Sequence, residues 1–372
     1  MATIALDATY ILDTNPTGIA TYSRRLIESL AELDTSRHFL LCYRLSRFSK
    51  RREFLRPAVR GPGGPTFSVR LFQRPFTFWL PWQAELFHSI AQRPPAFRFR
   101  REVVTVHDVF PITGPAYSTP EFQRKFSRLL REALARADRI LVLSEYTAGQ
   151  LFQHCGVDRQ RIRVIPGGVD APEKPISPEA RLRERERLVG EGNHLLLTVG
   201  VLETRKNVIS ALRALQLLPE RYRLVLAGGN GHGSEAIHAF IREQRLEARV
   251  QALGYVPAHR LQVLYQSASA LLFPSLEEGF GFPMLEAMAR GLPVVASRTS
   301  ALPELGGDAA LYVDPHDPSD IAGAATTAVE SPAVRQDLID RGLARASQFT
   351  WRRTAEETLK VYEELLRQTS GG

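Results

Sequence analysis

The stretch Ser275-Leu-Glu-Glu-Gly-Phe-Gly-Phe-Pro-Met-Leu-Glu286 decides how the second half of the chain is interpreted. It follows an apolar run over residues 268–273 that is typical of a short buried strand. Pro283 suits the first turn of a helix, where no backbone N–H is missed. The segment therefore predicts a strand, a tight loop and a helix. In parallel α/β sheets, ligands bind at such junctions.

Two carboxylates, Glu278 and Glu286, flank the glycine-rich turn within this stretch. Gly279 and Gly281 permit a positive φ and let the backbone approach a ligand closely. Free N–H groups and the dipole at the helix start favour a phosphate or sugar oxygen. We expect Glu278 to accept hydrogen bonds from sugar hydroxyls. Glu286, about one turn into the helix, is expected to accept hydrogen bonds from a second pair of hydroxyls, such as those of a ribose. A structural turn with two surface glutamates is the alternative.

Both halves of the chain alternate short apolar runs with helical segments, which indicates parallel sheets with crossover helices. A length of 372 residues suits two domains of ordinary size. We predict an α/β protein with two Rossmann-like domains. The expected strands are residues 3–6, 39–42, 86–88, 103–106, 140–143 and 162–165, then 195–199, 224–227, 250–253, 270–273, 294–296 and 310–313.

A segment rich in Pro and Gly, residues 166–175, separates the two halves, and a charged helix is expected over residues 178–188. We predict a first domain over residues 1–166, a linker with the charged helix over 167–193, a second domain over 194–350 and a last helix within 351–372. The apolar face expected for that last helix consists of Trp351, Leu359, Tyr362 and Leu366.

The composition, 44% hydrophobic and 24% charged, is that of a soluble globular protein. No apolar run approaches the roughly 20 residues that a bilayer span needs, and the first residues lack the pattern of a secretory signal. Cys42 and Cys155 lie far apart without the spacing of a metal site, which favours free thiols in a reducing compartment. We therefore expect a cytoplasmic protein.

Positive charge is concentrated in residues 1–166, which contain 25 Lys and Arg against 14 Asp and Glu, whereas the whole chain has 48 against 40. Basic residues cluster over 44–60 and 98–101, and again on an amphipathic helix predicted near Arg124–Arg131. This pattern favours an anionic partner, either the inner face of a membrane or a lipid-linked acceptor. An Arg-rich solvated surface is the alternative. Nucleic acid is not expected, because no nucleic-acid-binding module accompanies the charge.

The spacing Glu278-Gly-Phe-Gly-Phe-Pro-Met-Leu-Glu286 resembles the Glu-x7-Glu signature of the retaining glycosyltransferases of the GT-B fold, family four. Residues 291–297, 302–304 and 307–315 match the same family, and the combination of this stretch with Leu202-Glu-Thr-Arg-Lys-Asn207 resembles its mannosyltransferase-like branch. The resemblance implies two Rossmann-like domains facing a cleft, an acceptor-binding first domain, a second domain that binds the nucleotide sugar, and a last helix crossing back onto the first domain. The donor-binding residues implied in this stretch are Glu278, Gly279, Phe280, Gly281, Phe282 and Glu286.

The run Gly200-Val-Leu-Glu-Thr-Arg-Lys-Asn207 looks like the phosphate-binding loop of that family. Lys206 matches the lysine that contacts the donor diphosphate, where a cation neutralises the leaving group. Val201 departs from the family pattern, which often has Arg there, and Arg205 is expected to supply that charge. The alternative is that Arg205 and Lys206 only begin a helix. Tyr255 lies in a further segment that matches the family and frames the nucleotide base.

The first domain contributes fewer candidate residues. Gly18 lies in a turn that resembles the first glycine loop of the family, which faces the phosphate and acceptor side of the cleft, and the resemblance counts it among the donor-binding residues. His107 ends a predicted strand and matches the histidine near the donor sugar and the reacting centre, while a structural histidine is the alternative. His88 ends another strand and is a weaker candidate. The resemblance thus assigns the chemistry to His107, Lys206 and Glu278.

The expected reaction is transfer of a hexose, with mannose from GDP-mannose as the first choice and UDP-sugars next, to a saccharide or lipid-linked acceptor in surface polysaccharide or glycolipid assembly. In the family Glu278 would bind sugar rather than attack it, so front-face substitution is favoured over a carboxylate nucleophile. Because the sequence has no Asp-x-Asp triad and no metal-spaced cluster, we expect neither a cofactor nor an essential metal. A sugar-nucleotide epimerase of the same fold and a non-catalytic nucleotide-binding homologue are the alternatives.

Overall fold

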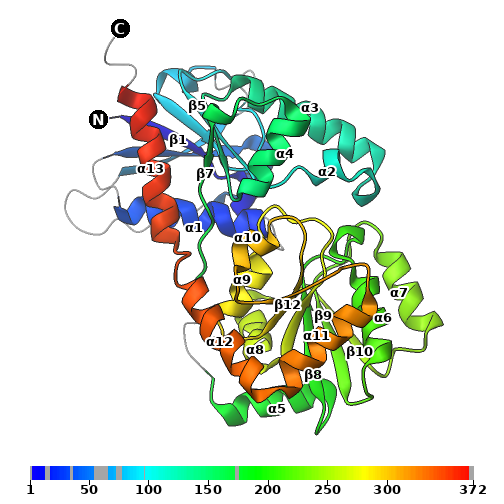
Figure 1. Ribbon diagram of the computed structural model, residues 1–372. Helices are drawn as coiled ribbons and strands as arrows, with labels where there is room; N and C mark the ends of the chain where they lie inside the picture. The colour runs from blue at the N-terminus through cyan, green and yellow to red at the C-terminus, as the bar shows by residue number, and fades with distance from the viewer. Residues whose placement is uncertain are drawn as a thin grey trace. The chain divides into compact units, whose positions relative to one another are not determined.

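The computed structural model describes residues 2–12, 17–33, 37–53, 66–72, 78–95, 97–171 and 176–367. The chain divides into two compact units. The first unit comprises Met1–Thr113, Pro120–Gly168 and Phe349–Gly372, and the second comprises Gly114–Thr119 and Val169–Gln348. Each unit is built on its own parallel sheet, so the predicted pair of Rossmann-like folds is confirmed (Figure 1).

The first unit contains a seven-stranded parallel sheet in the order β3-β2-β1-β4-β5-β6-β7. Its central strands are buried on both faces, as expected for runs of Val, Ile and Leu covered by helices. Strand β3 was not predicted, although its residues alternate polar and apolar side chains as expected for a strand at the edge of a sheet. The strands are β1 (Thr3–Asp7), β2 (His38–Arg44), β3 (Thr66–Phe72), β4 (Leu86–Ser89), β5 (Glu102–Val106), β6 (Arg139–Val142) and β7 (Ile162–Val164).

Helices connect these strands in crossovers. The hydroxyl of Ser144 caps α4 by accepting a hydrogen bond from the N–H of Thr147 at 3.1 Å. The helices of this unit are α1 (Gly18–Leu33), α2 (Phe110–Thr113), α3 (Pro120–Arg136), α4 (Glu145–Cys155) and α13 (Trp351–Arg367), and short 3-10 turns are η1 (Thr9–Leu12), η2 (Leu45–Glu53), η3 (Leu80–Trp82) and η5 (Arg159–Arg161).

The last helix, α13, belongs to the first unit and packs against α1, although more than 300 residues separate them in the sequence. Its buried face differs from the predicted one. Trp351 and Tyr362 are buried as expected, whereas Leu359 and Leu366 are only half-buried. The buried positions also include the aliphatic residues Val361 and Leu365 and the small residues Thr354, Ala355 and Thr358, which allow close packing.

The second unit contains a six-stranded parallel sheet in the order β10-β9-β8-β11-β12-β13. The strands are β8 (His194–Val199), β9 (Tyr222–Ala227), β10 (Val250–Gly254), β11 (Ala270–Phe273), β12 (Val294–Ser297) and β13 (Leu311–Val313). Around them lie η4 (Pro115–Tyr117), α5 (Pro178–Val189), η6 (Thr204–Lys206), α6 (Val208–Leu217), α7 (Ser234–Glu243), α8 (Ala258–Ser267), α9 (Phe282–Met288), α10 (Leu302–Gly306), α11 (Pro318–Glu330) and α12 (Pro332–Ala346).

Hydrophobic residues from α6, β9 and α11 form the main core of this unit, with Leu212, Leu226 and Ile321 fully buried. The charged helix predicted over residues 178–188 is α5, capped by Ser177. Residues 172–175 of the predicted linker lie outside the described residues. Across the described parts of the chain, no helix has the length and apolar character that crossing a bilayer requires.

Candidate active site

The strand order reverses in the second unit between β8 and β11, which are neighbours although they are not consecutive in the chain. Loops leaving the carboxyl ends of such strands border a crevice that parallel sheets use for ligands. After β8 comes the loop containing η6, with Arg205 and Lys206. After β11 comes the loop with Glu278, which runs into α9. The topology therefore brings the two predicted site segments together.

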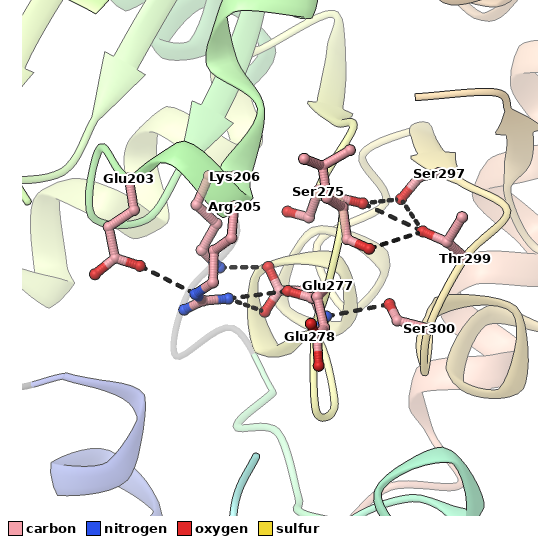
Figure 2. Close-up of polar contacts among 10 residues, drawn as sticks. Glu203, Arg205, Lys206, Ser275, Glu277, Glu278, Ser297, Thr299 and Ser300 are labelled. Atoms are coloured by element: carbon pink, nitrogen blue, oxygen red, sulfur yellow. Dashed lines mark hydrogen bonds and ion pairs between the residues drawn. The ribbon is translucent and has the colours of Figure 1, made fainter. Parts of the chain in front are cut away.

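These two loops meet in a buried ion-pair cluster, shown in Figure 2. The Lys206 ammonium lies 2.5 Å from Oε1 of Glu278, and Nη1 of Arg205 lies 3.1 Å from Oε2 of the same carboxylate. The Glu278 side chain is 8% exposed and that of Lys206 is 10% exposed. Glu203 completes the cluster by accepting a hydrogen bond from Nε of Arg205 at 3.0 Å.

Burial and charge act in opposite directions on these groups. Burial raises the pKa of Glu278, but Lys206 and Arg205 lower it by more in total, so the carboxyl titrates below its usual range. Burial lowers the pKa of the Lys206 ammonium, and the neighbouring Glu278 offsets only part of that effect. The cluster is thus a set of desolvated charges, in which losing one partner would be costly.

Backbone hydrogen bonds fix the two loops to each other. The N–H of Leu276 donates to the carbonyl of Arg205 at 2.8 Å, and the side-chain amide of Asn207 donates to the carbonyl of Pro274 at 3.1 Å. The N–H of Glu278 donates to the Ser300 hydroxyl at 3.1 Å. Ser300 has a φ of 57°, a conformation that non-glycine residues rarely adopt. The loop that carries Glu278 is therefore hydrogen-bonded both to the loop after β8 and to Ser300.

The glycine-rich turn requires glycine at Gly281, whose φ is 109°. A Cβ there would lie 2.6 Å from Cδ2 of Leu302. Phe280 is buried and its ring packs edge-on to that of Phe282, the first residue of α9, at 4.9 Å. Helix α9 has only seven residues, so the dipole that we expected from the sequence to favour an anion at its start is a weak one.

Glu286 lies on α9, one turn beyond its start, and is half-buried. Its Oε2 accepts a hydrogen bond from the Tyr265 hydroxyl at 2.8 Å, and the guanidinium of Arg290 lies 5.6 Å from the Tyr265 ring centre. Burial raises the pKa of Glu286, while the bond from Tyr265 lowers it in part. Tyr265 was not singled out from the sequence, because an aromatic residue in a helix usually signals only core packing.

Tyr255 follows the edge strand β10, which lies two strands away from β8. Its side chain is 40% exposed. The structure does not bring Tyr255 into the charged cluster, so its predicted contact with a nucleotide base has no support from the geometry of the cluster. Glu203, Asn207 and Ser300 do belong to the cluster or its support, although sequence reasoning did not assign them a role.

The first unit has its own polar group beside the strand-order reversal between β1 and β4. His107 follows β5 and is buried, with Nε2 2.8 Å from the carbonyl of Ile90. Because a carbonyl only accepts, this nitrogen carries the proton. Burial lowers the pKa of His107 to about 4, so the ring is neutral near pH 7. The edge of the Tyr22 ring packs against it, with ring centres 4.9 Å apart.

His88 is also buried in this group, with Nδ1 2.5 Å from the Tyr362 hydroxyl of α13 and Nε2 2.8 Å from the Thr105 hydroxyl. Burial lowers the pKa of His88 to about 3. Both of its ring nitrogens are therefore occupied by protein groups, which fits a structural role. Gly18 is the first residue of α1 and is exposed, while Asn15 and Pro16 of its predicted loop lie outside the described residues.

Among the side chains that the structure describes, no group of three or more His, Cys, Asp or Glu is arranged to hold a metal ion.

Sequence comparisons assign both halves of the chain to glycosyltransferase families. Residues 181–345 match the family described as "Glycosyl transferases group 1", and residues 16–172 match "Glycosyltransferase Family 4". The O-antigen chain mannosyltransferase B of Escherichia coli is 33% identical over 272 residues, which are 72% of this chain and 71% of the relative. A D-inositol 3-phosphate glycosyltransferase of Acidothermus cellulolyticus is 33% identical over 71% of this chain and 62% of its own length.

The serotype-specific mannosyltransferase WbdA of Escherichia coli is 29% identical over 72% of this chain, which spans only about a third of that protein. Among solved structures, Anabaena HepE in complex with UDP-glucose superposes with a TM-score of 0.75 at 19% identity, covering 98% of this chain and all of the other. WaaG, a glycosyltransferase involved in lipopolysaccharide biosynthesis, gives 0.70 at 16% identity, covering 97% and 99%. The chain therefore belongs to the GT-B glycosyltransferases that carry group 1 and family 4 domains.

Proposed function

We propose that this glycosyltransferase moves mannose from GDP-mannose to a saccharide or lipid-linked acceptor, with retention of configuration, in surface polysaccharide or glycolipid assembly. The choice of mannose is supported by the similarity to O-antigen chain mannosyltransferase B and to WbdA. UDP-sugars are the second choice, because HepE, which shares the fold, was crystallised with UDP-glucose.

The observation that carries this proposal is the pair of cations, Arg205 and Lys206, at the switch point of the second sheet. A donor diphosphate brings about two negative charges, and they grow on the leaving group as the sugar departs. A buried ammonium and a planar guanidinium stabilise such charge more strongly than exposed cations would. Glu278, held beside them, is suited to accept hydrogen bonds from the sugar hydroxyls.

For the reaction itself we propose front-face substitution. The acceptor hydroxyl attacks the anomeric carbon on the side from which the diphosphate leaves, and a phosphate oxygen takes its proton. Both oxygens of Glu278 contact cations, which supports a binding role rather than nucleophilic attack. We further propose that neutral His107 contacts the donor sugar, and that Gly18, Tyr255 and Glu286 contribute donor contacts.

We propose that catalysis needs no metal, because Arg205 and Lys206 supply the positive charge that a divalent ion provides in other transferases. Initial rates measured with EDTA and with added Mg²⁺ or Mn²⁺ are expected to agree. A loss of activity in EDTA that Mg²⁺ restores would contradict this.

We also propose that the first unit contacts an anionic membrane from the cytoplasmic side. On α3, Arg124, Lys125 and Arg128 are exposed beside Phe122, whose side chain is 47% exposed. Basic side chains next to an exposed aromatic ring favour the interface of anionic lipids. Cosedimentation with phosphatidylglycerol vesicles should be strong at low salt, weak at high salt, and absent with neutral phosphatidylcholine vesicles. Equal cosedimentation with both lipids would contradict it.

The proposal is tested by following release of the nucleoside diphosphate from GDP-mannose and UDP-sugars with saccharide and lipid-linked acceptors. We expect acceptor-dependent release with at least one donor, and its loss in Lys206→Ala and Glu278→Ala proteins that melt normally. Unchanged turnover in these variants would remove both residues from the reaction. Conversion of the donor to an epimer without acceptor, followed by NMR, would contradict transfer and support the isomerase alternative.

A further inference from the structure

The charged cluster of the second unit is already balanced by the side chains of the protein itself. Glu278 contacts Lys206 and Arg205, and Glu203 contacts Arg205. Each of these two cations thus already contacts a carboxylate of the protein. Those carboxylates offset part of the attraction that an entering anion would gain from the cations. A diphosphate that binds Lys206 must therefore compete with the carboxylate that already contacts it.

The geometry indicates which carboxylate gives way. Glu278 contacts both cations, one with each oxygen, whereas Glu203 contacts Nε of Arg205. The backbone of Glu278 is fixed by the hydroxyl of Ser300, and its carbonyl accepts from the N–H of Ala301 at 3.3 Å. The loop is therefore held in place, and rotation of the Glu278 side chain is enough to release both cations.

We propose that Glu278 is an internal counter-ion of the donor site: its carboxylate occupies the cations until the donor diphosphate displaces it, and it returns to them when the product leaves. This inference rests on the proposed function, since it assumes that the diphosphate binds at Lys206. Displaced from the cations, the carboxylate accepts hydrogen bonds from the hydroxyls of the donor sugar.

A displaced Glu278 should make the protein bind the nucleotide-sugar substrate differently from the nucleoside diphosphate product. A complete nucleotide sugar supplies both a diphosphate for the cations and hydroxyls for the displaced carboxylate. A nucleoside diphosphate supplies only the first, and leaves a buried carboxylate without partners, which is costly. Glu278 therefore weakens product binding relative to donor binding, and favours release of the product after transfer.

Calorimetric titrations with GDP and UDP test this on the whole chain. For the base that the wild type binds, Glu278→Gln is expected to tighten binding of the nucleoside diphosphate about tenfold, the size of one charge-assisted hydrogen bond. The corresponding nucleotide sugar should not gain in the same way, because its hydroxyls lose their acceptor. The matched control is Glu220→Gln, which removes the same charge from an 82% exposed side chain just before β9, and should leave both affinities unchanged.

Glu278→Asp is a second variant that keeps a charge in the loop if the buried amide prevents folding. Its shorter side chain loosens the ion pairs and should give an intermediate tightening. If the wild type binds the diphosphate through Lys206, so that Lys206→Met loses it, but neither Glu278 variant binds it more tightly, the counter-ion role is wrong and the proposed function stands. If the wild type binds neither GDP nor UDP, the proposed function fails and this inference fails with it.

Discussion

The two units place different chemistry at the carboxyl ends of their central strands. In the second unit, the carboxyl ends of β8 and β11 present Lys206, Arg205 and Glu278 as buried ions. In the first unit, the carboxyl ends of β4 and β5 present His88 and His107 as buried neutral rings. Both groups are shielded from water, but only one of them holds charge.

The difference shows how partners decide what burial does to an ionisable group. Without a counter-ion, burial lowers the pKa of His88 to about 3 and that of His107 to about 4, so both give up their protons. With two cations in contact, Glu278 stays ionised despite its burial. The second unit therefore holds buried charged groups, whereas the buried histidines of the first unit are neutral.

The largest effect is expected from removing charge in the second unit. Lys206→Met should lower kcat/KM for the donor by about 10³-fold, because a preorganised contact with the leaving group is lost. Steady-state kinetics would measure this, with Lys360→Met, at an exposed lysine of α13, as the control that keeps full activity. A loss of only a few-fold would mean that Lys206 does not neutralise the leaving group.

Acid should weaken the first unit through its neutral histidines. In the folded protein the pKa of His88 is about 3 and that of His107 is about 4. Below about pH 6.5 the unfolded chain therefore binds more protons than the folded protein, and the free energy of unfolding decreases as the pH is lowered. At pH 5 each histidine should cost about 2 kcal/mol of unfolding free energy relative to neutral pH.

Urea denaturation at pH 7 and pH 5 would measure this loss in the wild type and in His88→Gln. The variant should lose about 2 kcal/mol less than the wild type between the two pH values. Equal losses would show that His88 is not held neutral.

A smaller effect on stability is expected from removing the hydrogen bond between Tyr362 of α13 and the buried His88. Tyr362→Phe removes the hydroxyl 2.5 Å from Nδ1 of His88 and leaves that nitrogen unpaired. The unfolding free energy should fall by about 1.5 kcal/mol, while Tyr255→Phe, at an exposed tyrosine, should change nothing. If the two variants are equally stable, the bond between α13 and the sheet contributes little.

The smallest effect is expected at Glu286. Tyr265→Phe removes a hydrogen bond that lowers the pKa of Glu286, so this carboxyl should protonate at higher pH than in the wild type. If Glu286 holds the ribose, nucleoside diphosphate affinity should fall about threefold at neutral pH and further as the pH is lowered. Titrations at pH 7.5 and 6 would show it, and identical pH dependence in both proteins would argue against this role.

Much of this arrangement follows from local sequence. The apolar runs predict most of the strands, and the motifs in the loops after residues 199 and 273 are enough to single out Lys206 and Glu278. The ion pair itself is not predictable in this way, because it depends on β8 and β11 becoming neighbours. The bond between His88 and Tyr362 spans 274 positions, and a polar pair so distant leaves no periodic signal in the sequence.

A crystal structure with the intact nucleotide sugar bound would show directly whether the donor displaces Glu278 from its cations. We expect diphosphate oxygens at about 3 Å from the Lys206 ammonium and the Arg205 guanidinium, with the Glu278 carboxylate turned away from both and bonded to sugar hydroxyls. A bound donor whose diphosphate lies elsewhere, with the pair between Lys206 and Glu278 still closed, would contradict it.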